Sequence, residues 1–376
     1  MATRTWRGTL NSNYSNMANW AELAVPTNAD AVVFDASSPN CTVDVTSVAG
    51  TLTCTNFIHT LTFTANLTVS GSITLGTGMS FSGSGVLGIN ASGTLTSNGV
   101  TCPQPLSVLS GAGTVTFSGT WTNTGLVTLG SGGNNGLSNG TLVCNGGLNV
   151  GTGGIISGTT NININATGTI QSTGGGQLRP PLTIAAGAGT VTFSGTFFYN
   201  GGTLTYTSGT VITSGATISI VASTTFNTSG MTWNAIIVTA SITLTLNSVL
   251  NVTTFTLPNT NITFAGTGGF SIGTLTNTLY TATRTITYVN GVTYTITGSY
   301  TTVGVTPTIR QTIQSASAGN KFILTLQSGA TQFIGFTDIT DGDSSQGQQI
   351  FSYSGVITNT LNWRNSVNTI AQIYLQ

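Results

Sequence analysis

Apolar and small polar residues alternate one by one along almost the whole chain. Examples are LTF at 61–63, VTF at 115–117, INI at 162–164 and ITL at 242–244. Because successive side chains of a β-strand point to opposite faces, such runs place Val, Ile, Leu and Phe in a core and Thr, Ser and Asn outside. Each run is short and ends at Gly, Asn or Ser-Gly, which form turns. We therefore predict an all-β chain of many short strands.

Internal repeats decide how these strands are arranged. INASGTLTS at 89–97 recurs as INATGTIQS at 164–172, and GAGTVTFSGT at 111–120 recurs unchanged at 187–196. An offset of 75 or 76 residues covers several short strands, or three to four coils of a parallel β-helix. In this fold each coil stacks on the next and the inward apolar side chains form ladders. The predicted fold is a parallel β-helix (β-solenoid), with a right-handed coil expected.

Charged residues are almost absent, at 4% of the 376 residues, whereas an ordinary soluble domain has about a quarter. None lies between Asp44 and Arg179, or between Arg179 and Arg284. Neutral outer faces suit stacked coils, because like charges in a ladder repel while Thr and Asn can hydrogen-bond. Disorder is an unsuitable interpretation, since 39% of the residues are hydrophobic and regularly spaced. The neutral balance argues against nucleic acid, and no apolar run is long enough for a membrane helix.

Composition divides the chain into three segments. Residues 1–44 contain two tryptophans and six charged residues, and we predict an N-terminal cap there. Residues 45–280 form the predicted β-helix shaft with its repeat of about 75 residues. In 281–376 the charges return, which predicts a C-terminal cap or small β-domain. Within it, Asn290-Gly291 between two alternating runs predicts a hairpin.

Catalytic residues are scarce. No Asp or Glu lies between residues 45 and 337, whereas glycosidic hydrolysis normally needs two carboxyl groups across a cleft. The single histidine, His59, would have to serve any Ser or Cys nucleophile as its base; we expect it in a strand, hydrogen-bonded or exposed. The sequence predicts a protein that is not an enzyme, with no catalytic residues and no organic cofactor.

One carboxylate cluster is present, in DITDGDSSQG at 338–347. Asp338, Asp341 and Asp343 lie close together with a glycine, a composition that could bind Ca²⁺. Their order departs from that of an EF-hand loop. Two interpretations stay open, a solvated turn and a structural Ca²⁺ site.

Cysteines, threonines and aromatic residues each allow two interpretations. Cys41, Cys54, Cys102 and Cys144 are buried thiols acting as small hydrophobes, or Cys41 and Cys54 form a disulfide. Outward T-x-T pairs are the default of a charge-free strand, or a regular array that matches ice. A set of aromatic side chains is expected at the surface, against sugars or against a neighbouring subunit. These are Trp121, Phe197, Phe198, Tyr199, Tyr206 and Trp233.

Both ends of the chain carry recognisable motifs. The stretch TWRGTLNSNYSNMANWAELAVPTNADAVVF at 5–34 has the order W-x-G, N-W, V-P-T-x-x-D and then an apolar strand, through Trp6, Gly8, Asn19, Trp20, Val25, Pro26, Thr27 and Asp30. This order resembles the opening of phage-encoded and bacterial surface β-helix proteins. The stretch SASAGNKFILTLQSGATQFIGFTDITDGDSSQG at 315–347, with NTLNW at 359–363, is similar to their closing module. The resemblance implies a structural role and supplies no catalytic residue.

The leading functional hypothesis is a virion structural protein, namely a phage fibre, spike or capsid-decorating protein. Expected partners are copies of the chain itself in a homotrimer, other virion proteins of capsid or tail, and host surface glycans. The start MATRTWRGTL lacks the apolar segment of a secretory signal, which favours the virion. The alternatives are an extracellular or cell-surface adhesin or filament subunit, and a glycan-binding or glycan-degrading tailspike. Neither nucleic acid nor membrane insertion is expected.

Overall fold

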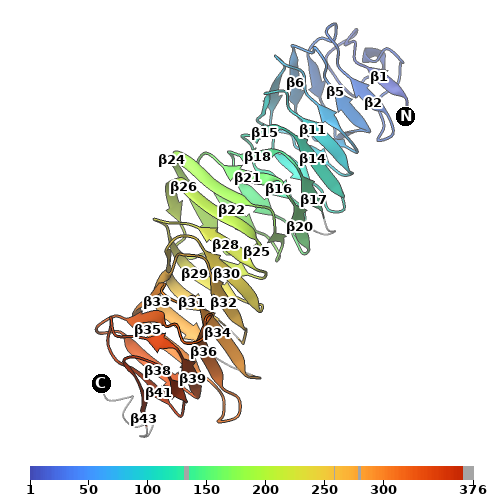
Figure 1. Cartoon of the computed structure of the whole chain (residues 1–376). Coiled ribbons are helices and arrows are strands. Elements are labelled where there is room, and N and C mark those ends of the chain that lie inside the picture. The colour runs from blue at the N-terminus through green and yellow to red at the C-terminus, as the bar shows by residue number, and fades with distance from the viewer. Residues whose placement is uncertain (131–134, 258, 278–280, 367–376) are drawn as a thin grey trace. The chain divides into compact units, whose positions relative to one another are not determined.

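The chain folds into stacked parallel β-strands, as the computed structural model in Figure 1 shows. The structure describes residues 1–130, 135–257, 259–277 and 281–366. These residues form 43 strands and one short 3-10 helix, η1 (Met17–Asn19). The strands stack as a β-solenoid and do not close a barrel, which confirms the predicted fold class. No helix among the described residues has the length and apolar character needed to cross a bilayer.

Two compact units make up the chain. Unit 1 comprises Met1–Ser194 and Thr207–Ile212, and unit 2 comprises Gly195–Tyr206 and Thr213–Gln376. Each unit is a stack of parallel strands, and we describe each by itself. The segments 1–44, 45–280 and 281–376 are compositional, and their role as cap, shaft and cap stays a prediction.

In unit 1 each turn contributes one short strand to each of three faces. The strands of the first face are β1 (Thr3–Thr5), β2 (Ala31–Val33), β5 (Thr51–Thr53), β8 (Ile73–Thr74), β11 (Gly93–Thr96), β14 (Thr114–Ser118), β17 (Gly136–Ser138), β20 (Ile155–Gly158) and β23 (Gln177–Leu178).

The second face holds two runs of paired strands. They are β3 (Cys41–Val43), β6 (Thr60–Phe63) and β9 (Ser80–Gly83), and then β12 (Thr101–Cys102), β15 (Thr120–Asn123), β18 (Thr141–Cys144), β21 (Asn161–Ile164) and the beginning of β24 (Leu182–Ser194). The strands of the third face are β4 (Ser47–Ala49), β7 (Leu67–Val69), β10 (Leu87–Ile89), β13 (Leu106–Val108), β16 (Val127–Leu129), β19 (Leu148–Val150), β22 (Gly168–Ser172) and the end of β24.

Apolar ladders form the core of unit 1. On the third face one ladder runs in register through seven turns, and all its side chains are buried. Its members are Leu67, Leu87, Leu106, Val127, Leu148, Ile170 and Phe193. Each buried aliphatic side chain contributes about 1.5–3 kcal/mol relative to an exposed one. The period-2 alternation therefore stabilises the fold without any charged group.

The two copies of GAGTVTFSGT lie on different faces. The first copy forms β14 on the first face, and the second copy runs through the end of β24 on the third face. The INASGTLTS and INATGTIQS copies are shifted in the same way, since the former leads into β11 and the latter into β22. The sequence repeat thus spans between three and four turns and moves each copy by one face.

From β25 to β36 unit 2 builds each turn from two strands, several of them long, and from β37 onward it again uses three short strands. One series comprises β25 (Thr196–Tyr199), β27 (Thr217–Ile220), β29 (Thr232–Val238), β31 (Leu250–Thr256), β33 (Phe270–Asn277), β35 (Thr293–Val303), β37 (Phe322–Leu326), β38 (Thr331–Gly335), β40 (Gly342–Asp343), β41 (Ile350–Tyr353) and β43 (Trp363–Ser366). The other series comprises β26 (Gly202–Ile212), β28 (Thr224–Asn227), β30 (Ile242–Leu246), β32 (Ile262–Ala265), β34 (Arg284–Tyr288), β36 (Gln311–Ser315), β39 (Thr337–Thr340) and β42 (Ile357–Thr358).

A bend in the long strands explains the difference between the units. The register of β33 and β35 shifts between Ile272 and Thr274. A Cβ on Gly273 would lie 2.6 Å from the Thr253 carbonyl oxygen, so only glycine lets the neighbouring turn approach this closely. β35 then pairs with two separate strands, β37 and β38. Within unit 2, β35 therefore covers two faces that β37 and β38 cover separately in the next turn.

The predicted hairpin at Asn290-Gly291 is wrong. A turn does occur there, with Gly291 at φ 70°. However, β34 pairs in parallel with β32 and β36, and β35 pairs in parallel with β33, β37 and β38. Turn chemistry fixes the local chain reversal only, and here the stacking of whole coils decides which strands pair.

Candidate functional site

The N-terminal end of unit 1 is closed by buried aromatic rings. Trp6 and Trp20 pack edge to face with ring centroids 5.1 Å apart, and Tyr14 packs on Trp20 at 4.8 Å. The Trp6 Nε1 donates a hydrogen bond to the Pro39 carbonyl oxygen at 3.1 Å. These residues include the tryptophans of the W-x-G and N-W motifs, so this part of the resemblance has a packing role.

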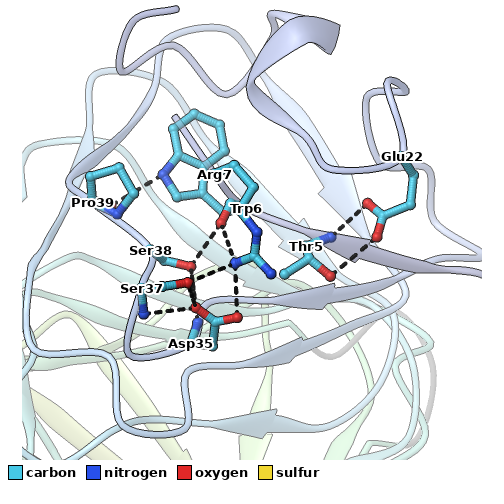
Figure 2. A network of polar contacts seen from close by, with 8 residues as sticks. All are labelled: Thr5, Trp6, Arg7, Glu22, Asp35, Ser37, Ser38 and Pro39. Carbon is cyan, nitrogen blue, oxygen red and sulfur yellow. Dashed lines mark hydrogen bonds and ion pairs between the residues drawn. The ribbon is translucent and has the colours of Figure 1, made fainter. Parts of the chain in front are cut away.

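A polar network lies beside Trp6 (Figure 2). Arg7 Nη1 lies 2.8 Å from Asp35 Oδ2 and also donates to Ser37 Oγ at 3.1 Å. Hydrogen bonds from Ser37 and Arg7 hold the pKa of Asp35 well below its usual range. Ser38 Oγ donates to the Trp6 carbonyl oxygen at 2.8 Å. These groups bind one another within the first 44 residues of unit 1.

Glu22 covers the exposed edge of β1. Its carboxylate accepts the Thr5 backbone N–H at 2.8 Å and the Thr5 hydroxyl at 3.1 Å. A free edge strand offers such groups to any other strand, and covering them blocks edge-to-edge pairing. The carboxylate therefore seals this end of unit 1.

The remaining carboxylates of the first 44 residues are also bound internally. The Thr27 backbone N–H and hydroxyl donate to Asp30, and together with Arg4 they lower the pKa of Asp30. At Asp44, burial opposes ionisation, but hydrogen bonds from Ser15 outweigh it and lower the pKa. All these acids stabilise folded structure in their ionised form.

His59 lies just before β6 and is exposed, outside the strand where we expected it. Its ring centroid is 6.0 Å from that of Phe57. The four cysteines are buried and free. Burial raises the pKa of the Cys54 and Cys102 thiols to about 12, so these thiols are protonated and unreactive at neutral pH. The interpretation as small hydrophobes fits this arrangement, and the disulfide does not form.

The three aspartates of the predicted Ca²⁺ site bind three different partners. Asp338 accepts two hydrogen bonds of 2.9 Å from Arg310 Nε and one of 2.8 Å from the Val356 N–H. Asp341 accepts the Gly319 N–H at 2.8 Å, and Asp343 accepts the Ser345 N–H at 2.8 Å.

Among the described residues no group of three or more acids, histidines or cysteines could hold a metal ion. The Ca²⁺ site stays a prediction.

The prediction of surface aromatics is wrong for four of the six residues. Trp121, Phe197, Tyr199 and Trp233 are buried in the core. Trp121 lies between the outward Thr120 and Thr122, and Phe197 and Tyr199 share the inward side of β25. On β29 the alternation breaks between Trp233 and Ile236, both of which are buried. Phe198 and Tyr206 are partly exposed.

Outward hydroxyl groups of unit 1 bond to each other between turns. The Thr60 and Ser80 hydroxyl oxygens are 2.8 Å apart, and those of Thr62 and Ser82 are 2.7 Å apart. Such contacts supply the cross-strand hydrogen bonds expected of a neutral ladder. They support the structural interpretation of the T-x-T pairs, and ice binding stays an untested alternative.

The most exposed aromatic side chains lie on strands near the C-terminal end of unit 2. Phe333 on β38 is 40% exposed and Phe351 on β41 is 43% exposed. Next to Phe351 in the parallel register is Arg364 on β43. An open hollow adjoins this arginine and is lined by Ser345, Gln349, Leu361, Asn362, Trp363 and Arg364. We call Phe333, Phe351 and Arg364 the outer aromatic column. Sequence analysis missed it, because the strand register that aligns these residues cannot be read from local alternation.

No family model, curated protein or solved structure matches the chain.

Proposed function

We propose that this chain is a non-enzymatic structural protein of a virion, a fibre, spike or capsid-decorating protein. One observation carries the non-enzymatic part: all seven carboxylates are bound to the protein's own groups. Their partners are Thr5 for Glu22, Thr27 for Asp30, Arg7 for Asp35, Ser15 for Asp44, Arg310 for Asp338, Gly319 for Asp341 and Ser345 for Asp343. Glycosidic hydrolysis needs two carboxyl groups free to face a substrate.

The virion part is supported by the motif residues of the N-terminal end. Trp6 and Trp20 pack together, Asp30 caps its own loop through Thr27, and Gly8 adopts φ 55° with no room for a Cβ against Pro39. The residues that carry the resemblance to phage-encoded β-helix proteins thus share a structural task. The neutral outer faces also favour homotrimer formation, because no charge repulsion opposes close approach of copies.

The virion role is tested by proteomics of particles purified on a density gradient from a lysate of the cells that produce this protein. The expected result is a fixed copy number of the chain per particle, in multiples of three. Recovery in the cell-envelope fraction, with none in the particles, would contradict the proposal and favour an adhesin or filament subunit.

The non-enzymatic role is tested separately. The purified full-length chain is incubated with capsular polysaccharide of the host, and chain length and new reducing ends are measured over a day. Polysaccharide of unchanged length is expected. Shortened chains, with loss of the effect on heating the protein, would contradict the proposal and favour a degrading tailspike.

A further inference from the structure

The outer aromatic column is unusual because its rings face solvent. Among the described residues no other aromatic side chain reaches the exposure of Phe333 and Phe351, while most phenylalanines are fully buried. Scattered single apolar residues on a surface need no explanation. Two exposed rings and an arginine on neighbouring strands of one outer face, in contrast, need an explanation.

The register brings the three residues together. Gly335 on β38 pairs in parallel with Tyr353 on β41, and Phe333 and Phe351 each lie two residues before that pair. Phe351 in turn pairs with Arg364 on β43. The three residues therefore lie on consecutive strands of one series, with the Gln332 side chain between the backbones of β38 and β41 at Phe351.

Gln332 holds the backbone beneath the column. Its Oε1 accepts the Phe351 N–H at 2.9 Å, and its Nε2 donates to the Gln349 carbonyl oxygen at 2.9 Å. A side-chain amide therefore replaces the backbone hydrogen bonds at this point. Gln332 is a positioning residue, which fixes where the Phe351 ring stands.

Arg364 is exposed and has no hydrogen-bond or ion-pair partner among the described residues, unlike Arg4, Arg7 and Arg310. The carboxylate of Asp343, on β40, accepts the Ser345 N–H. The guanidinium is therefore available for a carboxylate from outside, which it can bind through two parallel N–H donors.

The size of the column argues against a protein partner. At about 40% of roughly 200 Å² each, the two rings offer only about 80 Å² apiece, whereas a stable protein interface buries about 800 Å² per partner. A sugar ring fits better. Its C–H face can pack on the electron-rich face of a phenyl ring.

We propose that Phe333, Phe351 and Arg364 form a binding site for an acidic polysaccharide, with sugar rings on the phenyl groups and a sugar carboxylate on the guanidinium. The site deepens the proposed virion role and rests on it only for the source of the ligand, a host surface. The expectation of binding depends only on the residues of the outer aromatic column.

The test uses the full-length chain and a panel of acidic polymers: polygalacturonate, alginate, hyaluronate and polysialate. Binding is measured by affinity electrophoresis and calorimetry, and the best binder is compared with its methyl ester, which lacks only the charge. We expect binding to at least one polymer. For that polymer F333A/F351A should weaken binding at least about tenfold and R364Q about three- to tenfold.

Controls separate the site from general effects. V356A removes another exposed apolar side chain of unit 2, 58% exposed, and should bind as the unchanged protein does. R364Q should no longer distinguish the acid from its ester. Absence of binding to every acidic polymer, equal binding of acid and ester, or equal loss in V356A would each overturn the proposal.

These outcomes are independent of the particle experiment. The chain can be found in virions and fail to bind, which overturns the site alone. It can bind and be absent from virions, which overturns the virion role alone. Unchanged melting temperatures of the variants show that any loss of binding is not unfolding.

Discussion

Two regions of the chain have the same sequence and different places in the fold. GAGTVTFSGT at 111–120 forms β14 on the first face, and its copy at 187–196 forms the end of β24 on the third. In both copies the valine and the phenylalanine are buried, and the threonine between them faces outward. The same alternating sequence can therefore form a strand of the first face or of the third face.

The copies differ at their second glycine. Gly113 adopts φ 76° in the turn before β14, whereas Gly189 does not have a positive φ and lies within the continuous strand β24. Local sequence thus fixes which side chains point inward, and the neighbouring coils fix whether the chain turns or continues. This interchangeability suits the proposed structural role, and the proposed binding site lies in residues that depart from it, those of the outer aromatic column.

The largest expected effect comes from the inward phenylalanines. Phe117 stacks on Leu95 and Phe193 on Ile170, and each is 1% exposed. F117A and F193A should each lower the free energy of unfolding of unit 1 by about 3–5 kcal/mol.

Guanidinium titrations followed by circular dichroism measure this loss. The outward change T192A should cost less than about 0.5 kcal/mol. T116A should cost about 0.5–1.5 kcal/mol, because it also removes the 2.9 Å hydroxyl contact with Ser138. A large loss of unfolding free energy in only one of F117A and F193A would contradict the equivalence of the two faces.

A smaller loss of stability is expected from substitution of the last glycine of each copy, which is its second-to-last residue. Gly119 (φ 81°) and Gly195 (φ 63°) have positive φ, and a Cβ on either would meet nothing within 4 Å. G119A and G195A should therefore each cost about 1–2 kcal/mol from backbone strain alone.

Gly140 provides the contrast, because a Cβ there would lie 2.3 Å from the Gly119 carbonyl oxygen. G140A should cost clearly more than G119A in the same titration. Equal costs would mean that the close approach of turns is not constrained as described.

The smallest effect is a loss of stability at low pH. We expect it in residues 1–44 and not in the two copies of GAGTVTFSGT. The pKa values of Asp30, Asp35 and Asp44 are lowered in the fold. Their stabilisation is complete above the unfolded pKa of about 4 and is lost as pH falls through the folded values. Digestion with pepsin between pH 4 and 2 should first cut within residues 1–44, and D35N should weaken that pH dependence. First cuts near residue 115 or 191 would contradict this assignment.

Much of the fold could be predicted from sequence because alternation and repeats are local. The inward position of Trp121 was also readable, since Trp121 alternates with Thr120 and Thr122 as Phe117 does with its neighbours. The expected surface position of this large ring contradicted the alternation and was wrong. The correct rule is that phase along the strand, not ring size, sets the side.

The outer aromatic column could not be predicted. Phe333 and Phe351 meet only because the coil between them has one particular length, and coil length varies along unit 2. Thr301, which pairs with Phe333, lies much further away in sequence than Phe351 does. Similarly, the Asn290-Gly291 turn was readable, while the partners of β34 and β35 depend on the adjoining coils.

Hydrogen exchange of the two identical copies tests the central claim most directly. Because their sequences are equal, their intrinsic exchange rates are nearly equal, and peptides that extend into different flanks can be told apart by mass. We predict that the amides of Thr114–Ser118 and of 190–194 both exchange at least about a thousandfold more slowly than the unfolded chain. Rapid exchange in either copy would contradict the claim that one neutral alternation builds equivalent faces of a β-solenoid.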